Sequence, residues 1–250
     1  MQILTLTGGT NEIVFNDAPF VLNSIDYGNP SDDPVPTRTV KLTGYILAEG
    51  ETEASRASYL TEKRALLCRA VMADGGFTIS RGSRMIRAKA KGIPSFSGAP
   101  EFSGSDAAMF TITAEADAHF VGTSSGITYG GQTSASATYG YVNMTNPGDV
   151  PVGCVISISY NGTSLSGASV TIDGKTVTFT SSVPNNGTVT VDTRLGKKSV
   201  YTSSGVNFAL ITAGSKFPII PTGASTLSWS APSGGITSVS VTVEPEYYER

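Results

Sequence analysis

Few residues in this chain have the types and spacing that catalysis needs. The chain holds one histidine, His119, and two cysteines, Cys68 and Cys154. A Ser-His-Asp triad would need His119 as its base, but this residue lies at the end of an expected strand, in Ala118-His119-Phe120, where a packed or interfacial histidine is the ordinary reading. The two cysteines and the histidine have no zinc-ligand spacing. We therefore expect no catalytic residue, no metal and no cofactor, and so no enzyme.

Paired carboxylates are the other chemistry that the composition allows, because a glycoside hydrolase uses two of them. The available acids are Asp32, Asp33, Asp149, Asp173, Asp192, Glu244 and Glu246. Asp32 and Asp33 fall in a proline-rich loop and Asp173 falls in a hairpin turn, which are common structural positions for aspartate. The sequence does not indicate which pair would face each other at the required separation.

A basic cluster lies within residues 81–91, which hold five of the 17 Lys and Arg residues. Alternation along a strand places Arg87, Lys89 and Lys91 on one face. That face is either a solvated one that blocks edge-to-edge aggregation or a contact for an acidic neighbouring subunit. Nucleic-acid binding is less favoured, because no aromatic residue is interleaved for base stacking. The candidate inter-subunit contacts are Arg81, Arg84, Arg87, Lys89, Lys91 and, on a predicted helix, Lys63.

The overall charge and hydropathy exclude several classes of protein. The net charge is −3 and the pI is about 5.2, so no global electrostatic attraction to nucleic acid or anionic membrane follows. No segment has the roughly 18 consecutive apolar residues of a membrane span. The start of the chain lacks a basic segment followed by an apolar one, so we expect synthesis and folding in a cytoplasm. Two cysteines make no disulfide framework, and we expect free core thiols.

One helix stands among many predicted strands in the first half of the chain. Residues 53–73 show an amphipathic pattern, with Leu60, Leu67 and Val71 on one stripe. Thr52 is the expected N-cap, and the glycines after Asp74 are the expected left-handed C-cap, which ends the helix near residue 74. Lys63 falls inside the apolar stripe, so it must extend to solvent or find an acid, from its own subunit or from the next one.

Strands with period-two alternation surround this helix. Residues 38–47 place Val40, Leu42 and Gly44 on one face, and residues 109–116 direct Phe110 and Ile112 inward. Residues 93–105 are rich in Pro, Gly and Ser and are expected to form a loop. These patterns predict a β-rich first domain with one α-helix, residues 1–124.

The second half of the chain is predicted to be purely β. Residues 122–140 are rich in small residues and indicate either a linker or a weak edge strand. Residues 169–180 indicate a hairpin that turns at Asp173-Gly174, and residues 208–211 indicate a strand. Strands at such short intervals predict a β-sandwich or a jelly roll over residues 125–250, and Trp229 alternates with Leu227 as a core residue.

Several short sequence motifs occur in a set order along the chain. They are Asp74-Gly75-Gly76-Phe77-Thr78-Ile79, Ala116-Asp117-Ala118-His119-Phe120, Asn146-Pro147-Gly148-Asp149-Val150-Pro151, Val191-Asp192-Thr193, Ser215-Lys216-Phe217-Pro218 followed by Pro221-Thr222-Gly223, and Tyr247-Tyr248-Glu249-Arg250. Together with the order of elements, they resemble the distal tail protein (Dit) family of long-tailed siphophages. The resemblance covers nearly the whole chain.

The resemblance implies a fold and a structural role. The first domain corresponds to the family's belt domain with its one helix, and the second corresponds to a galectin-like β-sandwich. Such proteins form a hexameric ring in the virion, at the tip of the phage tail. The ring binds the tail tube protein, the tail-tip hub or tail-associated protein, and receptor-binding or baseplate proteins, and DNA passes through its lumen as cargo. The alternatives are another tail-tube or baseplate subunit, or a carbohydrate-binding module.

Overall fold

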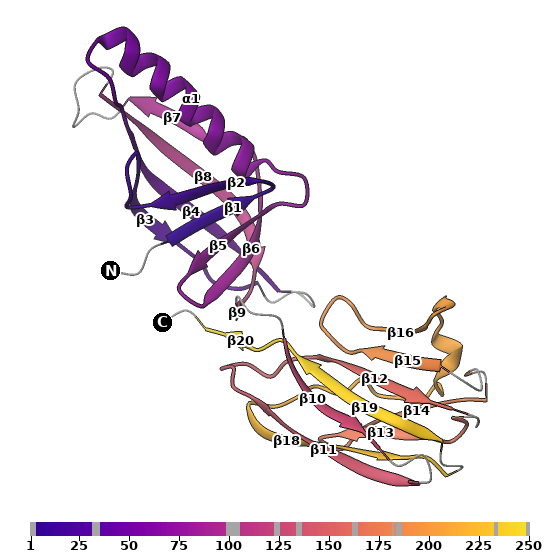
Figure 1. The fold of residues 1–250 in the computed structure, drawn as a ribbon. Coiled ribbons are helices and arrows are strands. Elements are labelled where there is room, and N and C mark those ends of the chain that lie inside the picture. Colours follow the sequence, from indigo (N-terminus) through magenta and orange to yellow (C-terminus); the bar gives the residue numbers. More distant parts are fainter. Residues whose placement is uncertain are drawn as a thin grey trace. The chain divides into compact units, whose positions relative to one another are not determined.

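The computed structural model divides the chain into two compact units, residues 1–123 and 124–250. It describes residues 4–31, 36–98, 106–122, 126–133, 137–161, 165–181, 183, 187–232 and 235–248. Each unit is built from antiparallel β-sheet, and the described residues hold one α-helix, which confirms the predicted mainly β fold (Figure 1).

The first unit is one twisted antiparallel sheet. Its strand order is β2 (Asn11–Phe15), β1 (Leu4–Gly8), β5 (Phe77–Arg81), β6 (Arg84–Ala90), β8 (Ala107–Asp117), β4 (Thr37–Leu47) and β3 (Phe20–Asp26). Two short strands extend it: β7 (Ser95–Gly98) pairs with β8, and β9 (Phe120–Gly122) pairs with β6. The predicted alternation is confirmed, since Val40, Leu42, Phe110 and Ile112 are all buried.

The helix α1 (Glu53–Val71) packs on the buried face of this sheet, against β1, β2, β4 and β8. Thr52 is its N-cap, as predicted: the Thr52 hydroxyl accepts a hydrogen bond from the Ser55 amide at 3.1 Å. Leu60, Leu67 and Val71 are buried, which confirms the apolar stripe. The close packing depends on Gly8, because a Cβ there would lie 1.8 Å from the Ala70 carbonyl oxygen.

Two expectations for the first unit are corrected. The helix ends at Val71, with Met72 as a C-cap that is not left-handed, and the left-handed glycines Gly75 and Gly76 lie in the following turn. The expected loop over residues 93–105 contains strand β7, because its backbone pairs in register with residues 108–111 of β8. Residues 99–105 of that loop lie outside the described part.

The second unit is a sandwich of two antiparallel sheets. The six-stranded sheet has the order β10 (Ile127–Gln132), β19 (Ile236–Val243), β12 (Cys154–Tyr160), β15 (Gly187–Asp192), β16 (Ser199–Thr202) and β17 (Gly205–Val206). The four-stranded sheet has the order β11 (Tyr139–Asn146), β18 (Gly223–Ser230), β13 (Ser169–Ile172) and β14 (Lys175–Thr178). Side chains from both sheets form a single core, which includes Trp229 as expected. A two-residue strand, β20 (Glu246–Tyr247), follows β19.

The turns explain where the strands of the second unit begin and end. The β13–β14 hairpin turns at Asp173 and Gly174, which both have positive φ, the geometry of a two-residue hairpin turn. Residues 122–140 were expected to be either a linker or a weak edge strand. The structure has strand β10 there, at the edge of the six-stranded sheet. The strand expected at residues 208–211 is wrong: the Asn207 side chain accepts from the Ala209 amide and starts a 3₁₀ turn, η1 (Phe208–Leu210).

Some predicted features fall outside the described residues, namely Asp32-Asp33 and the terminal Glu249-Arg250. Within the described ranges, no helix is long and apolar enough to cross a membrane.

Candidate functional site

The basic side chains of β6 line a hollow on the solvent-facing side of the first sheet. Arg87 and Lys89 are exposed on β6, and exposed Lys91 follows the strand. The hollow has a volume of about 370 Å³, and Gly75 lies at its rim. These three cations therefore share one surface, as the strand alternation predicts.

Acidic residues of β8 line the same hollow. Glu115 lies directly opposite Lys89 in the pairing of β6 with β8, and Asp117 lies two residues further along. The Lys91 ammonium donates to the Thr39 hydroxyl at 3.1 Å and lies 4.0 Å from the Glu115 carboxylate. Lys91 is thus largely engaged within its own chain, whereas Arg87 and Lys89 present their charges outward.

The other candidate contact residues lie elsewhere in the first unit. Arg81 and Arg84 flank the turn between β5 and β6, at the far end of β6 from the hollow. Lys63 finds its acid on its own helix: its ammonium lies 3.1 Å from the Glu62 carboxylate and 4.9 Å from the centre of the Tyr59 ring. The hydrogen bond with Glu62 raises the pKa of Lys63 above its ordinary value. A role of these six residues in subunit contacts stays a prediction.

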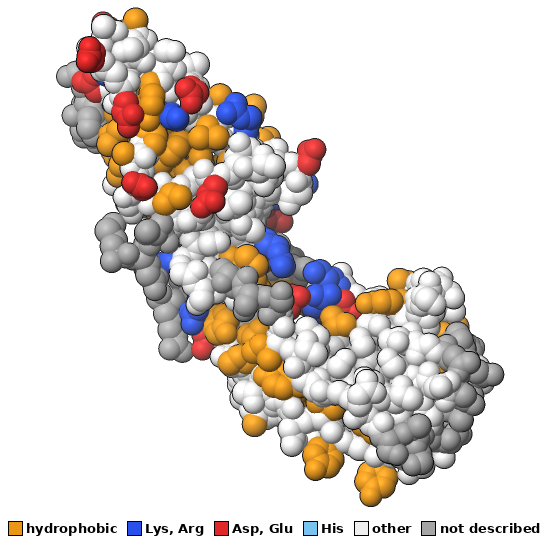
Figure 2. Space-filling view, viewed as in Figure 1, with side chains coloured by type: hydrophobic (Ala, Val, Ile, Leu, Met, Phe, Trp, Pro, Cys, Tyr) orange, Lys and Arg blue, Asp and Glu red, His pale blue; other side chains and the backbone are white. Residues whose placement is uncertain are grey.

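An acidic patch at the start of α1 complements the hollow and was not singled out by the sequence reasoning. Glu49, Glu51 and Glu53 are all exposed there, and Figure 2 shows acidic side chains over this end of the first unit. A helix of 19 residues spans about 28 Å. Because Gly75 at the rim of the hollow follows the end of α1, the acidic patch and the hollow lie at opposite ends of the helix.

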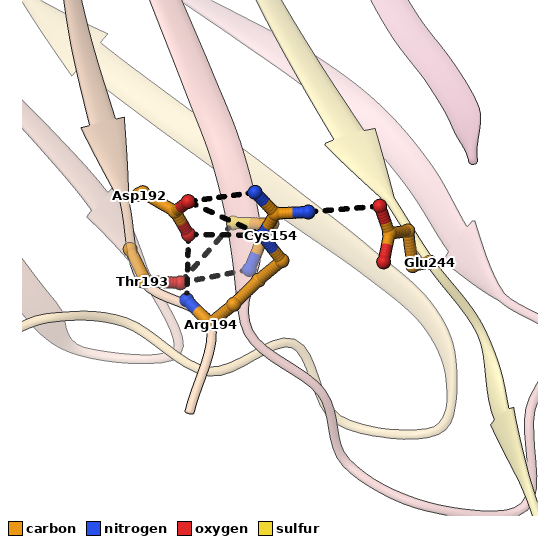
Figure 3. A network of polar contacts seen from close by, with 5 residues as sticks. All are labelled: Cys154, Asp192, Thr193, Arg194 and Glu244. Carbon is orange, nitrogen blue, oxygen red and sulfur yellow. Dashed lines mark hydrogen bonds and ion pairs between the residues drawn. The ribbon is translucent and has the colours of Figure 1, made fainter. Parts of the chain in front are cut away.

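A second charged group ties together three strand ends of the sandwich (Figure 3). Arg194, just after β15, donates from Nη2 to the Asp192 carboxylate at 2.7 Å and from Nη1 to Glu244 at 2.8 Å. The hydrogen bond with Asp192 raises the pKa of Arg194 further, so the guanidinium stays charged. Asp192 and Glu244, two candidates for a carboxylate pair, therefore bind one shared cation.

Thr193 connects this group to Cys154 at the start of β12. The Thr193 hydroxyl accepts from the Cys154 amide at 2.8 Å and lies 3.7 Å from the Cys154 sulfur, to which it donates. Burial raises the pKa of the Cys154 thiol to about 11, so it is a protonated thiol at neutral pH. Cys154 is the free core thiol that was expected, but Cys68 is only partly buried.

The structure explains why Asn146 and Gly148 occur in the motif at residues 146–151. Asn146 is fully buried, its carboxamide accepts from the Gly148 amide at 3.0 Å, and it donates to the Val150 carbonyl at 2.8 Å. A side chain at residue 148 would lie 2.4 Å from the Glu246 carbonyl oxygen, so glycine is required there. Asn146 and Gly148 therefore shape the turn that follows β11.

His119 is partly buried between β8 and β9, so the packed and the interfacial interpretations both stay predictions. Among the described residues, no three His, Cys, Asp or Glu side chains gather in a way that could hold a metal ion.

Comparisons with known proteins identify no family. No family model matches the chain, and no curated protein matches its sequence. Among solved structures, the chain is similar to a β-porphyranase of glycoside hydrolase family 86 from the human gut bacterium Bacteroides plebeius, with 13% identity and a TM-score of 0.25. The match covers 95% of this chain and 38% of that one. A likeness this weak carries no conclusion about fold or activity.

Proposed function

We propose that the chain is a distal tail protein, a structural subunit whose six copies close into a ring at the tip of a phage tail. The observation that carries the proposal is the order of its two units: a sheet covered by a single helix precedes an all-β sandwich. The motif at residues 146–151, which resembles the start of the family's second domain, lies at the turn between β11 and β12, the second and third strands of the sandwich. In this role the ring joins the tail tube to the tip proteins and lets DNA pass through its lumen.

The charges of the first unit support a head-to-tail ring. A closed ring requires two different patches on each subunit, because every copy contacts its two neighbours through different surfaces. The exposed cations Arg87 and Lys89 lie beyond one end of α1, and Glu49 and Glu51 lie before the other. We assign the exposed cations Arg87 and Lys89 of one subunit to a contact with the acidic patch of the next.

Charge reversal tests both the assembly and this assignment. The full chain is expected to have a mass of six copies in native mass spectrometry and light scattering at low salt. Reversing two cations, Arg87→Glu with Lys89→Glu, is expected to weaken assembly by about tenfold or more, because like charges then face each other. Adding Glu49→Lys and Glu51→Lys to the same chain is expected to restore the ring, because the opposite charges are exchanged.

The matched control is Lys197→Glu with Lys198→Glu, which reverses two exposed lysines of the second unit. The control is expected to assemble like the unchanged chain. A chain that stays monomeric at every concentration contradicts the proposed function. Rings that form equally well with and without the reversed charges contradict only the assigned contact.

A further inference from the structure

The outer face of the four-stranded sheet carries two strongly exposed tyrosines. Tyr139 and Tyr141 on β11 are 79% and 71% exposed. They are two residues apart on one strand, so both project from the same face, about 7 Å from each other. The alternate residues Val142 and Met144 point into the core. Figure 2 shows separate hydrophobic side chains projecting from the second unit on the side where Figure 1 draws β11 and β18.

The surface beside these rings is polar and uncharged. Tyr139 lies opposite Ser230, and Tyr141 lies opposite Ser228. The next strand continues the two rows with Ser169 and Thr171. The other outward residues on the four strands are Asn, Thr and one Ala, so this face presents hydroxyl and carboxamide groups and no charged side chain.

The strand that carries the tyrosines is held firmly from below. A Cβ at Gly140 would lie 2.6 Å from the Trp229 indole, so only glycine lets the indole pack directly beneath β11. Trp229 is 4% exposed and belongs to the sandwich core. The rings of Tyr139 and Tyr141 therefore stand on a strand that packs directly against the sandwich core.

We propose that this face binds a neutral oligosaccharide of two or more units. The apolar faces of sugar rings can stack on the two tyrosines while sugar hydroxyls exchange hydrogen bonds with the neighbouring Ser, Thr and Asn side chains. The lack of cations disfavours a phosphorylated or nucleic-acid ligand. The lack of outward aliphatic side chains disfavours a protein partner, whose contact would need an apolar core. All residues of this face come from one copy of the chain.

The test uses the full chain and a panel of neutral oligosaccharides of two to six units, built from hexoses, N-acetylhexosamines and deoxyhexoses. Binding is followed by titration calorimetry and by the emission of Trp229, the single tryptophan, which packs beneath the site. We expect at least one member to bind. The double variant Tyr139→Ala with Tyr141→Ala is expected to lose about tenfold or more in affinity, whereas Tyr139→Phe with Tyr141→Phe stays within about threefold because it keeps the stacking rings.

The control is Phe208→Ala, which removes an exposed aromatic ring elsewhere in the same unit and is expected to leave affinity unchanged. Circular dichroism verifies that each variant folds. Failure of the whole panel to bind overturns the proposal, and so does unchanged binding by the double alanine variant or an equal loss in the double phenylalanine variant. Loss of self-association in the double alanine variant, without saccharide binding by the unchanged chain, would assign the face to a second copy instead.

Discussion

Cys154 shows how one buried side chain links the packing of the sandwich to pH. Its thiol is fully buried, and burial raises its pKa to about 11. The ordinary value of 9.0 applies to the unfolded chain. Between these two values the unfolded chain loses a proton that the folded chain keeps. The folded state is therefore progressively disfavoured as the pH rises from 9 to 11, whereas ionisation of Cys154 adds no pH dependence to stability well below pH 9.

This reasoning predicts a pH-dependent difference between the unchanged chain and Cys154→Ala. Urea unfolding at several pH values is expected to show stability falling above pH 9 by up to about 1.4 kcal/mol for each pH unit because of this thiol. Cys154→Ala should lose that part of the slope. Cys68→Ala, which removes the partly buried thiol, serves as the control and should keep most of the fall of stability with pH. Identical slopes for the unchanged chain and Cys154→Ala would contradict the prediction.

At the scale of elements, the contact between α1 and β1 depends on the absence of a side chain at Gly8. A Cβ at this position would lie 1.8 Å from the Ala70 carbonyl oxygen, and both partners are backbone held in regular structure. Gly8→Ala is therefore expected to lower the free energy of unfolding of the first unit by about 1–3 kcal/mol, because the helix must move away from the sheet.

Thermal and urea unfolding of the full chain measure this effect, with Gly92→Ala as the matched control. Gly92 has nothing within 4 Å of its would-be Cβ and has no positive φ. Its substitution is expected to change stability by no more than about 0.5 kcal/mol. An equal effect of the two substitutions would show that the close approach of helix and strand is unimportant.

Periodicity allowed most elements to be predicted, because regular alternation reports burial directly. Leu60, Leu67 and Val71 marked the helix, and Phe110 and Ile112 marked the long strand β8. Strand β7 was missed because its composition is typical of a loop, and it is a strand only through its pairing with β8. The apolar run at residues 208–211 was misread because the Asn207 side chain favours a 3₁₀ turn.

The two charged sites and the tyrosine face were less accessible to sequence reasoning. Glu244 meets Arg194 across 50 residues of sequence, and only the sheet order brings these strand ends together. Glu49 and Lys89 lie at opposite ends of the first unit only because of the length and direction of α1. Tyr139 lies in a segment rich in small residues, and such a composition predicts a linker or a weak edge strand but not a binding surface.

At the scale of the whole molecule, each unit has its own core. The side chains of the sandwich form one cluster confined to residues 142–243. The helix and the sheet of the first unit bury a separate set that includes Leu67 and Phe110. Because a hydrophobic core is what makes unfolding cooperative, two cores predict two transitions when the full chain is heated.

Differential scanning calorimetry with two variants can assign these transitions. Gly8→Ala is expected to lower the midpoint of one transition by several degrees and leave the other in place. Asp192→Asn should lower the other midpoint instead, because Asp192 is buried and its charge is held by Arg194. A single transition that both substitutions shift would show that the units unfold as one body. In that case a ring contact made by the first unit would also stabilise the sandwich. If the transitions are separate, assembly should raise only the midpoint of the first unit, which is the one that Gly8→Ala lowers.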